Sequence, residues 1–180
     1  MDPSVTPSGE KTAIRKATPQ DAGAIQAIYA HHVLNGLGTF EEVPPDVAEM
    51  TARMASVAAQ GMPWLVAESD GSIVAYAYAA PFRPRSAYRF TVENSVYVAP
   101  DRMGCGFGSR LLNSLVDECR SMGIREMLAV IGDSGNAGSI SLHAKCGFEH
   151  QGLLKQVGLK FGRWIDVVIM QRTLSQYRDN

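Results

Sequence analysis

The chain has 180 residues, of which 46% are hydrophobic, and its formal net charge at pH 7 is −1. A chain of this length buries one ordinary hydrophobic core, and its interspersed charges form no basic surface of the kind that binds nucleic acid or an anionic membrane. No apolar run reaches the length of a bilayer span, and the three cysteines lack metal-ligand spacing. These features predict a cytoplasmic protein with reduced thiols and without a metal, nucleic-acid or membrane partner.

Both ends of the chain differ in composition from its middle. Residues 1–11 are rich in Pro, Ser and Thr and have no hydrophobic periodicity, which predicts a disordered leader. Regular periodicity continues from residue 12 to residue 174, so we expect one folded domain there, followed by a short tail over residues 175–180.

The domain is predicted to begin with a strand and two helices. Residues 13–17 predict the strand, and the Thr-Pro pair at 18–19 is typical of a helix start. That helix is expected to end at Gly36, and a second helix is expected to begin near Pro45. Residues 39–42 lie between the two helices, and we expect this lip segment to border a functional site.

Three strands are predicted next. Residues 63–68 and 72–80 flank a Ser-Asp-Gly sequence at 69–71, which is typical of a hairpin turn. An arginine-containing loop follows, and the β-branched and aromatic residues at 90–98 predict the third strand.

The strand at 90–98 leads through a glycine-rich loop into a helix. Gly104, Gly106 and Gly108 carry no side chain that would keep a ligand from the backbone, so several N–H groups can point at one anion. Apolar residues recur on one stripe of the following segment until Gly123, which predicts an amphipathic helix. Neither the Rossmann nor the Walker glycine spacing fits. The pattern therefore predicts a phosphate or pyrophosphate site.

The last third of the chain predicts a strand at 126–131, a short helix at 136–146 and two strands at 148–157 and 163–173. A helix connects the strand at 126–131 to the strand at 90–98, which favours a parallel pair, whereas the final two strands predict an antiparallel pair. The expected fold class is therefore α+β, a mixed α/β arrangement.

The segment Met103-Gly104-Cys105-Gly106-Phe107-Gly108 resembles the acyl-CoA pyrophosphate loop of the GNAT superfamily, [Q/R]-x-x-G-x-[G/A], with Met103 where Gln or Arg is usual. The order of predicted elements over residues 13–174 also resembles a GNAT domain. TVENSVYV, NAGSISLHAKCGF and VGLKFGRWIDVVIMQ are similar to the phosphinothricin and methionine sulfoximine acetyltransferases. The resemblance implies a twisted mixed sheet of about seven strands, splayed between strands 4 and 5 and flanked by four helices.

The resemblance also implies an acetyl-CoA-dependent N-acetyltransferase that modifies the α-amino group of a small amino acid or analogue by direct transfer. It implies that the β-strand backbone at 96–98 pairs with the pantetheine arm and that the glycine loop binds the pyrophosphate. Asn136 is a candidate helix N-cap, and the resemblance implies that it contacts CoA as well. The implied cofactor-binding residues are Val96, Tyr97, Val98, Gly104, Cys105, Gly106, Phe107, Gly108, Ser109 and Asn136.

Glu93 is the first candidate catalytic residue. A carboxylate in the middle of an apolar strand is unusual, and burial penalises its ionised form, which raises its pKa and suits a base that accepts a proton from an ammonium nucleophile. The alternative is that Glu93 pairs with a nearby arginine such as Arg83 or Arg89. It also matches the acidic residue of the TVE motif in the subgroup that the chain resembles.

His143 is the second candidate. It occupies the helix position where many GNAT enzymes place a tyrosine that protonates the departing thiolate, and an imidazole can do the same near neutral pH. The alternative is a structural histidine on a half-buried helix. His31, His32 and His150 are expected to be surface or cap residues.

Arg83 and Arg85 precede the Glu93 strand, where two guanidinium groups could bind a substrate carboxylate; the alternative is a solvated basic loop. The resemblance implies that this loop, the TVENS segment and an aromatic lip residue form an amino-acid pocket. The implied substrate-binding residues are Phe40, Arg83, Pro84, Arg85, Tyr88, Glu93, Asn94 and Ser95.

Two rival functions stay open, namely acetylation of protein N-termini or polyamines by the same fold, and a CoA-binding module without turnover. The family resemblance suggests a homodimer, and the apolar final strand permits one. The segment 160–164 is expected either to close the site or to form a dimer contact, and Phe161, Trp164 and Ile165 are the candidate contact residues.

Overall fold

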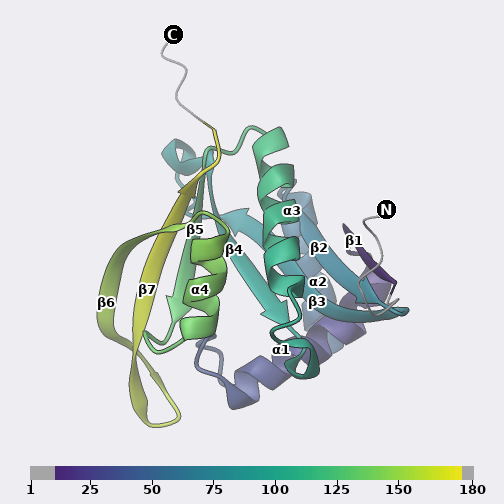
Figure 1. Cartoon of the computed structure of the whole chain (residues 1–180), viewed down its shortest axis with the longest axis horizontal. Coiled ribbons are helices and arrows are strands. Elements are labelled where there is room, and N and C mark those ends of the chain that lie inside the picture. Colours follow the sequence, from purple (N-terminus) through teal and green to yellow (C-terminus); the bar gives the residue numbers. More distant parts are fainter. Residues whose placement is uncertain (1–10, 176–180) are drawn as a thin grey trace.

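The computed structural model describes residues 11–175 and contains one seven-stranded sheet with strand order β1-β2-β3-β4-β5-β7-β6 (Figure 1). The predicted leader and tail lie outside the described residues except for Lys11 and Ser175. The strands are β1 (Thr12–Lys16), β2 (Trp64–Ser69), β3 (Ser72–Pro81), β4 (Thr91–Val98), β5 (Glu126–Gly132), β6 (Glu149–Lys160) and β7 (Arg163–Thr173).

Four α-helices flank the sheet in the described part of the chain, as predicted: α1 (Ala22–Asn35), α2 (Val47–Ala59), α3 (Phe107–Ser121) and α4 (Ala137–Lys145). Three short 3₁₀ helices lie at Pro19–Asp21, Ser86–Tyr88 and Pro100–Arg102. Among residues 11–175, no helix is long and apolar enough to cross a bilayer.

Local hydrogen bonds explain where the helices begin. The Asp46 carboxylate accepts a hydrogen bond from the N–H of Glu49 at the start of α2, and the Asn136 amide oxygen accepts one from the N–H of Ser139 at the start of α4. Each such cap contributes about 1 kcal/mol. Asn136 is therefore the helix cap that the sequence predicts.

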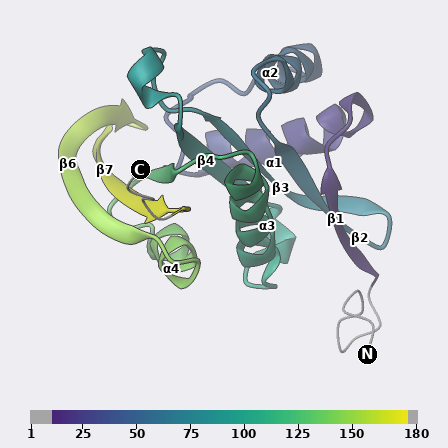
Figure 2. The same cartoon turned by 90° about the horizontal axis from the view of Figure 1, so that it is seen from above.

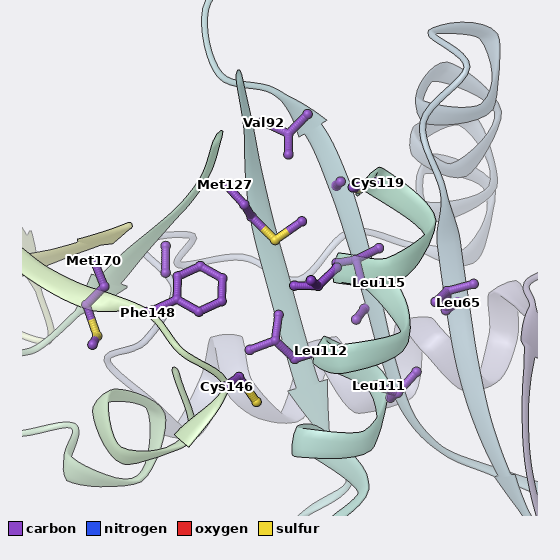
Figure 3. Packing of buried hydrophobic residues seen from close by; sticks show 14 of the residues in the cluster. Leu65, Val92, Leu111, Leu112, Leu115, Cys119, Met127, Cys146, Phe148 and Met170 are labelled. Carbon is purple, nitrogen blue, oxygen red and sulfur yellow. The ribbon is translucent and has the colours of Figure 1, made fainter. Parts of the chain in front are cut away.

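α1 and α2 cover one face of the sheet, and α3 and α4 lie on the other (Figure 2). The α3 side chains Leu112 and Leu115 gather with Val92 of β4 and Met127 of β5 in a buried cluster that continues to Phe148 (Figure 3). A second cluster, on the opposite face, contains the α1 and α2 side chains and the aromatic residues of β2 and β3. The sheet is thus the middle layer between two cores.

The sheet splays where the resemblance implied. β4 and β5 are parallel and pair from Thr91 with Glu126 to Asn94 with Ala129. Beyond Asn94, β5 continues to pair with β7, while the second half of β4 has no β5 partner. The fold is therefore the predicted α+β arrangement with a parallel pair of strands that separate partway along.

The β6–β7 hairpin forms one edge of the sheet and curves strongly (Figure 2). Gln156 has φ +54° at a register shift in β6, and its N–H donates to the Asp166 carboxylate at 2.9 Å. This bulge accounts for the bend and carries β6 three residues beyond the predicted end at 157, to Lys160.

The prediction that Ile165 belongs to an exposed contact surface is wrong, because this side chain is only 2% exposed. In the hairpin strand β7, alternate side chains point to opposite faces, and Ile165 belongs to the inner face. Trp164 lies on the outer face and is 63% exposed, and Phe161 in the turn is 53% exposed.

Candidate active site

A cleft of about 820 Å³ occupies the splay. The unpaired half of β4, the glycine loop, β5, α4 and the loop after α1 all contribute to its walls. Of the ten predicted cofactor-binding residues, the cleft is lined by all except Cys105, namely Val96, Tyr97, Val98, Gly104, Gly106, Phe107, Gly108, Ser109 and Asn136.

The β4 backbone presents hydrogen-bonding groups to this cleft. The C=O of Thr91 accepts from Phe82, and the N–H of Ala99 donates to Val74, so odd-numbered residues of β4 bond toward β3. The backbone groups of Val96 and Val98 therefore face the cleft, where β5 has moved away. This edge can accept a further extended chain in the manner of an added strand.

His32 of α1 was expected at the surface, but it lines the cleft and is partly buried. Its Nε2 is 2.8 Å from the C=O of Val98, so Nε2–H donates to that carbonyl. Burial lowers the pKa of His32, and the bond to Val98 opposes this shift only in part. Sequence reasoning missed the contact because the two residues are 66 positions apart.

The glycine loop combines left-handed backbone with a close helix contact. Gly104 and Gly106 have φ values of +78° and +83°, which disfavour residues with a side chain. At Gly108 the constraint is close packing and not backbone conformation, since a Cβ there would lie 3.2 Å from the Leu142 side chain of α4. α3 begins at Phe107, and Gly106 is its N-cap.

Asn94 and His143 form a buried pair at the point where the strands separate. The Asn94 amide nitrogen donates to the C=O of Leu128 at 2.9 Å, and its oxygen lies 3.0 Å from His143 Nε2. His143 Nδ1 lies 2.8 Å from the C=O of Ser139 and 3.4 Å from its hydroxyl. Burial lowers the pKa of His143, which favours a neutral ring with one N–H to donate.

These contacts bear on both predicted roles. Asn94 is 5% exposed and lies on the face of β4 opposite Glu93, with its amide already bonded to Leu128 and His143. His143 lines the cleft but is 4% exposed, and both ring nitrogens contact protein oxygen atoms. A proton passed from its Nε2 to a thiolate would require the bond to Asn94 to break first.

Glu93 points to the α1 and α2 face of the sheet, in the same direction as Ser95 and Tyr97. Within residues 11–175, no hydrogen bond or ion pair engages its carboxylate, so the alternative of a paired structural glutamate finds no support there. Burial raises its pKa, and the positive charge of Arg83 opposes this shift. An unpaired, partly buried carboxylate of this kind suits a general base.

The arginine loop lies beside the cleft rather than in its wall. Arg83 and Arg85 are exposed and line a separate groove of about 570 Å³, together with Pro84. The Arg83 guanidinium lies 4.5 Å from the ring of Phe82, and Tyr88 packs edge-on against the same ring at 5.7 Å. Arg83 therefore affects the pKa of Glu93 through its positive charge and makes no hydrogen bond or ion pair with that carboxylate.

The lip segment is held by residues that sequence reasoning did not single out. The Tyr29 hydroxyl donates to Glu41 at 2.8 Å and lies 2.8 Å from the Thr39 hydroxyl. Arg53 donates to both carboxylate oxygens of Glu41, at 2.6 and 3.1 Å. Burial raises the pKa of Tyr29 to about 12. These bonds join α1, α2 and the lip beside the cleft.

Cys105 is an exposed free thiol, and Cys119 and Cys146 are buried free thiols. In the part of the chain that the structure describes, no group of three or more His, Cys, Asp or Glu side chains could hold a metal ion. The expectation of chemistry without a metal stays a prediction.

Comparison with known proteins identifies the class. The family model described as an acetyltransferase (GNAT) domain matches residues 14–169. A phosphinothricin N-acetyltransferase from Alcaligenes faecalis is 56% identical over 162 residues, covering 90% of this chain and 82% of that protein. An L-methionine sulfoximine/L-methionine sulfone acetyltransferase from Pseudomonas paraeruginosa is 43% identical over 92% of this chain and 96% of its own length.

The fold agrees with these sequence matches. A crystal structure of a GNAT superfamily phosphinothricin acetyltransferase from Sinorhizobium meliloti in complex with AcCoA superposes with a TM-score of 0.87 and 45% identity, covering 90% of this chain and 88% of that one. The chain belongs to the GNAT family of N-acetyltransferases and is closely related to its phosphinothricin and methionine sulfoximine acetyltransferases. The predicted family, fold and enzyme class are confirmed.

Proposed function

We propose that this protein transfers the acetyl group of acetyl-CoA to the α-amino group of a small amino acid or analogue, of the phosphinothricin or methionine sulfoximine type. The observation that carries the proposal is the unpaired, partly buried carboxylate of Glu93 on the strand whose second half borders the cleft. The similarity to enzymes named for these substrates supports the choice of acceptor.

The chain has the groups needed to hold acetyl-CoA. The backbone of Val96 and Val98 faces the cleft without a strand partner and suits an extended pantetheine arm. Gly104 and Gly106 let the loop backbone turn toward an anion at the N-terminus of α3, which suits a pyrophosphate. Acetyl-CoA supplies the activated acetyl group, and the remaining chemistry belongs to residues of the chain.

Glu93 accepts a proton from the acceptor ammonium, directly or through one water, and so leaves a neutral amine. The amine nitrogen forms a bond to the thioester carbonyl carbon, and as the carbon–sulfur bond breaks the nitrogen loses a second proton, which the departing thiolate takes up. Backbone N–H groups of β4 in the cleft donate to the carbonyl oxygen as its negative charge develops. His143, neutral and beside the cleft, is the candidate to carry this second proton: after leaving Asn94 the ring accepts it from the nitrogen and passes it to the thiolate.

The test is thiol release from acetyl-CoA across a panel of amines. Phosphinothricin, methionine sulfoximine, methionine sulfone and common amino acids form the first arm; polyamines and peptides with free N-termini form the second. Turnover confined to the first arm is expected. Faster turnover of peptides or polyamines would mean that one of these is the acceptor instead. Tight CoA binding without thiol release in the presence of any amine would mean that the protein is a binding module.

Arg83 and Arg85 are proposed to recognise the acceptor carboxylate. Because both guanidinium groups are exposed, their interaction is weakened by water, and the double change to Ala is expected to raise the acceptor KM by about tenfold. Acetyl-CoA affinity should not change. Arg89→Ala is the matched control, since Arg89 lines the same groove and donates to Ser86. Equal activity on an amino acid and on its decarboxylated amine would contradict this role.

We also propose a homodimer that forms through the outer surface of the β6–β7 hairpin. The hairpin exposes six large apolar side chains, which is costly in water and typical of an interface. They are Leu153, Leu154, Val157, Leu159, Phe161 and Trp164.

Replacing Leu159 and Trp164 together with Asp is expected to convert the dimer to a monomer in sedimentation velocity, because two charges would be buried at the contact. Val47→Asp, at an exposed apolar position on α2, should leave the dimer intact. A monomer at all concentrations of the unmodified protein would remove the proposal. A cytoplasmic location stays a prediction.

A further inference from the structure

Lys160 is a buried lysine that the proposed mechanism does not use. It is the last residue of β6, at the tip of the β6–β7 hairpin, and it is only 1% exposed. Its Nζ donates to the C=O of Thr39 in the lip segment at 2.8 Å and lies 5.0 Å from the ring of Phe161. A buried ammonium group is costly, and here the carbonyl and the ring offset part of that cost.

A second contact joins the same two parts of the chain. The Phe40 ring of the lip lies against Gly158 of β6, where a Cβ would overlap the ring. A Cβ at Gly132 of β5 would come within 2.5 Å of the Leu37 carbonyl oxygen and within 3.1 Å of the same ring. Glycine at both positions therefore leaves room for the chain at 37–40, Gly158 for the Phe40 ring and Gly132 mainly for the Leu37 carbonyl.

The lip also contacts the cleft itself. Thr39 lines the cleft, and its hydroxyl bonds with Tyr29 of α1 and is within reach of the Tyr97 hydroxyl of β4. The lip thus touches both strands of the splay, β4 through Tyr97 and β5 through Gly132. A shift of the lip would change the wall of the cleft at Tyr97, which lies on the same face of β4 as Glu93, the proposed base for the acceptor.

We propose that the tip of the β6–β7 hairpin, through Lys160 and Gly158, holds the lip in the position that completes the acceptor pocket. Both are positioning residues, because they act through Thr39 and Phe40 and do not themselves line the cleft. The inference rests on the proposed function in one respect, namely that the lip borders the acceptor.

The main test replaces Lys160 with Met, which keeps the length of the side chain and removes the ammonium group. The acceptor KM is expected to rise by about tenfold, while the dissociation constant for acetyl-CoA stays within about twofold, because the lip and the pyrophosphate loop are separate parts of the cleft. Lys155→Met is the matched control, since Lys155 is an exposed lysine on the same strand. An acceptor KM within about twofold of the unmodified protein would overturn the proposal.

Gly158→Ala tests the second contact and leaves Lys160 in place. The added methyl group should expel the Phe40 ring and raise the acceptor KM in the same direction. Gly152→Ala is its control, because a Cβ at that position of β6 meets nothing within 4 Å. Should Lys160→Met fail to fold, an unchanged acceptor KM in Gly158→Ala would still overturn the proposal.

Hydrogen exchange separates this proposal from the proposed function. Amides of residues 39–42 are expected to exchange about tenfold faster in Lys160→Met, with residues 104–109 unchanged, whether or not any amine is acetylated. Unchanged exchange in the lip would overturn the positioning role. A lack of turnover by the unmodified protein with every amine would defeat the proposed function alone.

Discussion

Glu93→Gln is expected to lower kcat by about 100-fold, which corresponds to about 2.7 kcal/mol of transition-state stabilisation, with acetyl-CoA affinity unchanged. An α-ammonium group is protonated at neutral pH, and glutamine keeps the shape of the side chain but cannot accept its proton. Steady-state kinetics with saturating acetyl-CoA measure the loss. Glu126→Gln is a matched control, because this glutamate of β5 accepts hydrogen bonds from Gln171 and Thr173 and lies outside the cleft lining.

The pH profile gives an independent readout of the same residue. Burial raises the pKa of Glu93, so the carboxylate becomes a competent base only as the pH rises through a value above the usual range of glutamate. The acidic limb of kcat/KM should therefore lie above that range in the unmodified protein and should move or disappear in Glu93→Gln. Near-native kcat with an unaltered acidic limb would mean that Glu93 only positions the substrate.

The raised pKa also predicts a change in stability. A carboxyl group whose pKa is higher in the folded state favours folding at low pH, and this contribution is lost as the pH rises through the folded pKa. Glu93→Gln should therefore raise the melting temperature at pH 7 to 8. The difference should vanish below the unfolded value of 4.5, where both side chains are uncharged. A lower melting temperature at pH 8 would indicate an ion pair instead.

Gly106→Val is expected to weaken acetyl-CoA binding by at least about 100-fold, or about 2.7 kcal/mol. Gly106 has φ +83°, where a residue with a side chain costs roughly 1–2 kcal/mol, and a β-branched residue is among the least tolerant. The loop would relax to another backbone conformation, and its N–H groups would no longer converge on one anion. Titration calorimetry with acetyl-CoA measures the loss.

Gly123→Val is the matched control for this substitution. Gly123 has φ +81° just beyond the opposite end of α3, and a Cβ at either glycine meets nothing within 4 Å, so both variants carry similar backbone strain. Both should lower the melting temperature, but only Gly106→Val should lose affinity. Met103→Ala should bind acetyl-CoA normally, because the Met103 side chain is exposed and the pyrophosphate site is proposed to consist of backbone N–H groups. An equal loss in both glycine variants would point to general destabilisation.

Much of the fold and part of the site could be predicted from local sequence signals. The α3 stripe, the Asn136 cap and the turn glycines each depend on neighbours within a few residues, so the elements lie within a few residues of their predicted bounds. Glu93 could be singled out because alternation along one strand places it among apolar residues. These inferences need no knowledge of how the elements pack.

The tertiary structure alone decided the contacts between distant segments. Nothing in the sequence around Lys160 points to Thr39, and only folding brings the two residues, 121 positions apart, into contact. His32 reaches Val98 across 66 positions because α1 packs beside β4, and Ile165 is buried because it belongs to the inner face of β7. The physical reason is the same in each case. The burial of a side chain and the residues that it contacts depend on how whole helices and strands pack, and this packing cannot be inferred from the spacing of residues along the chain.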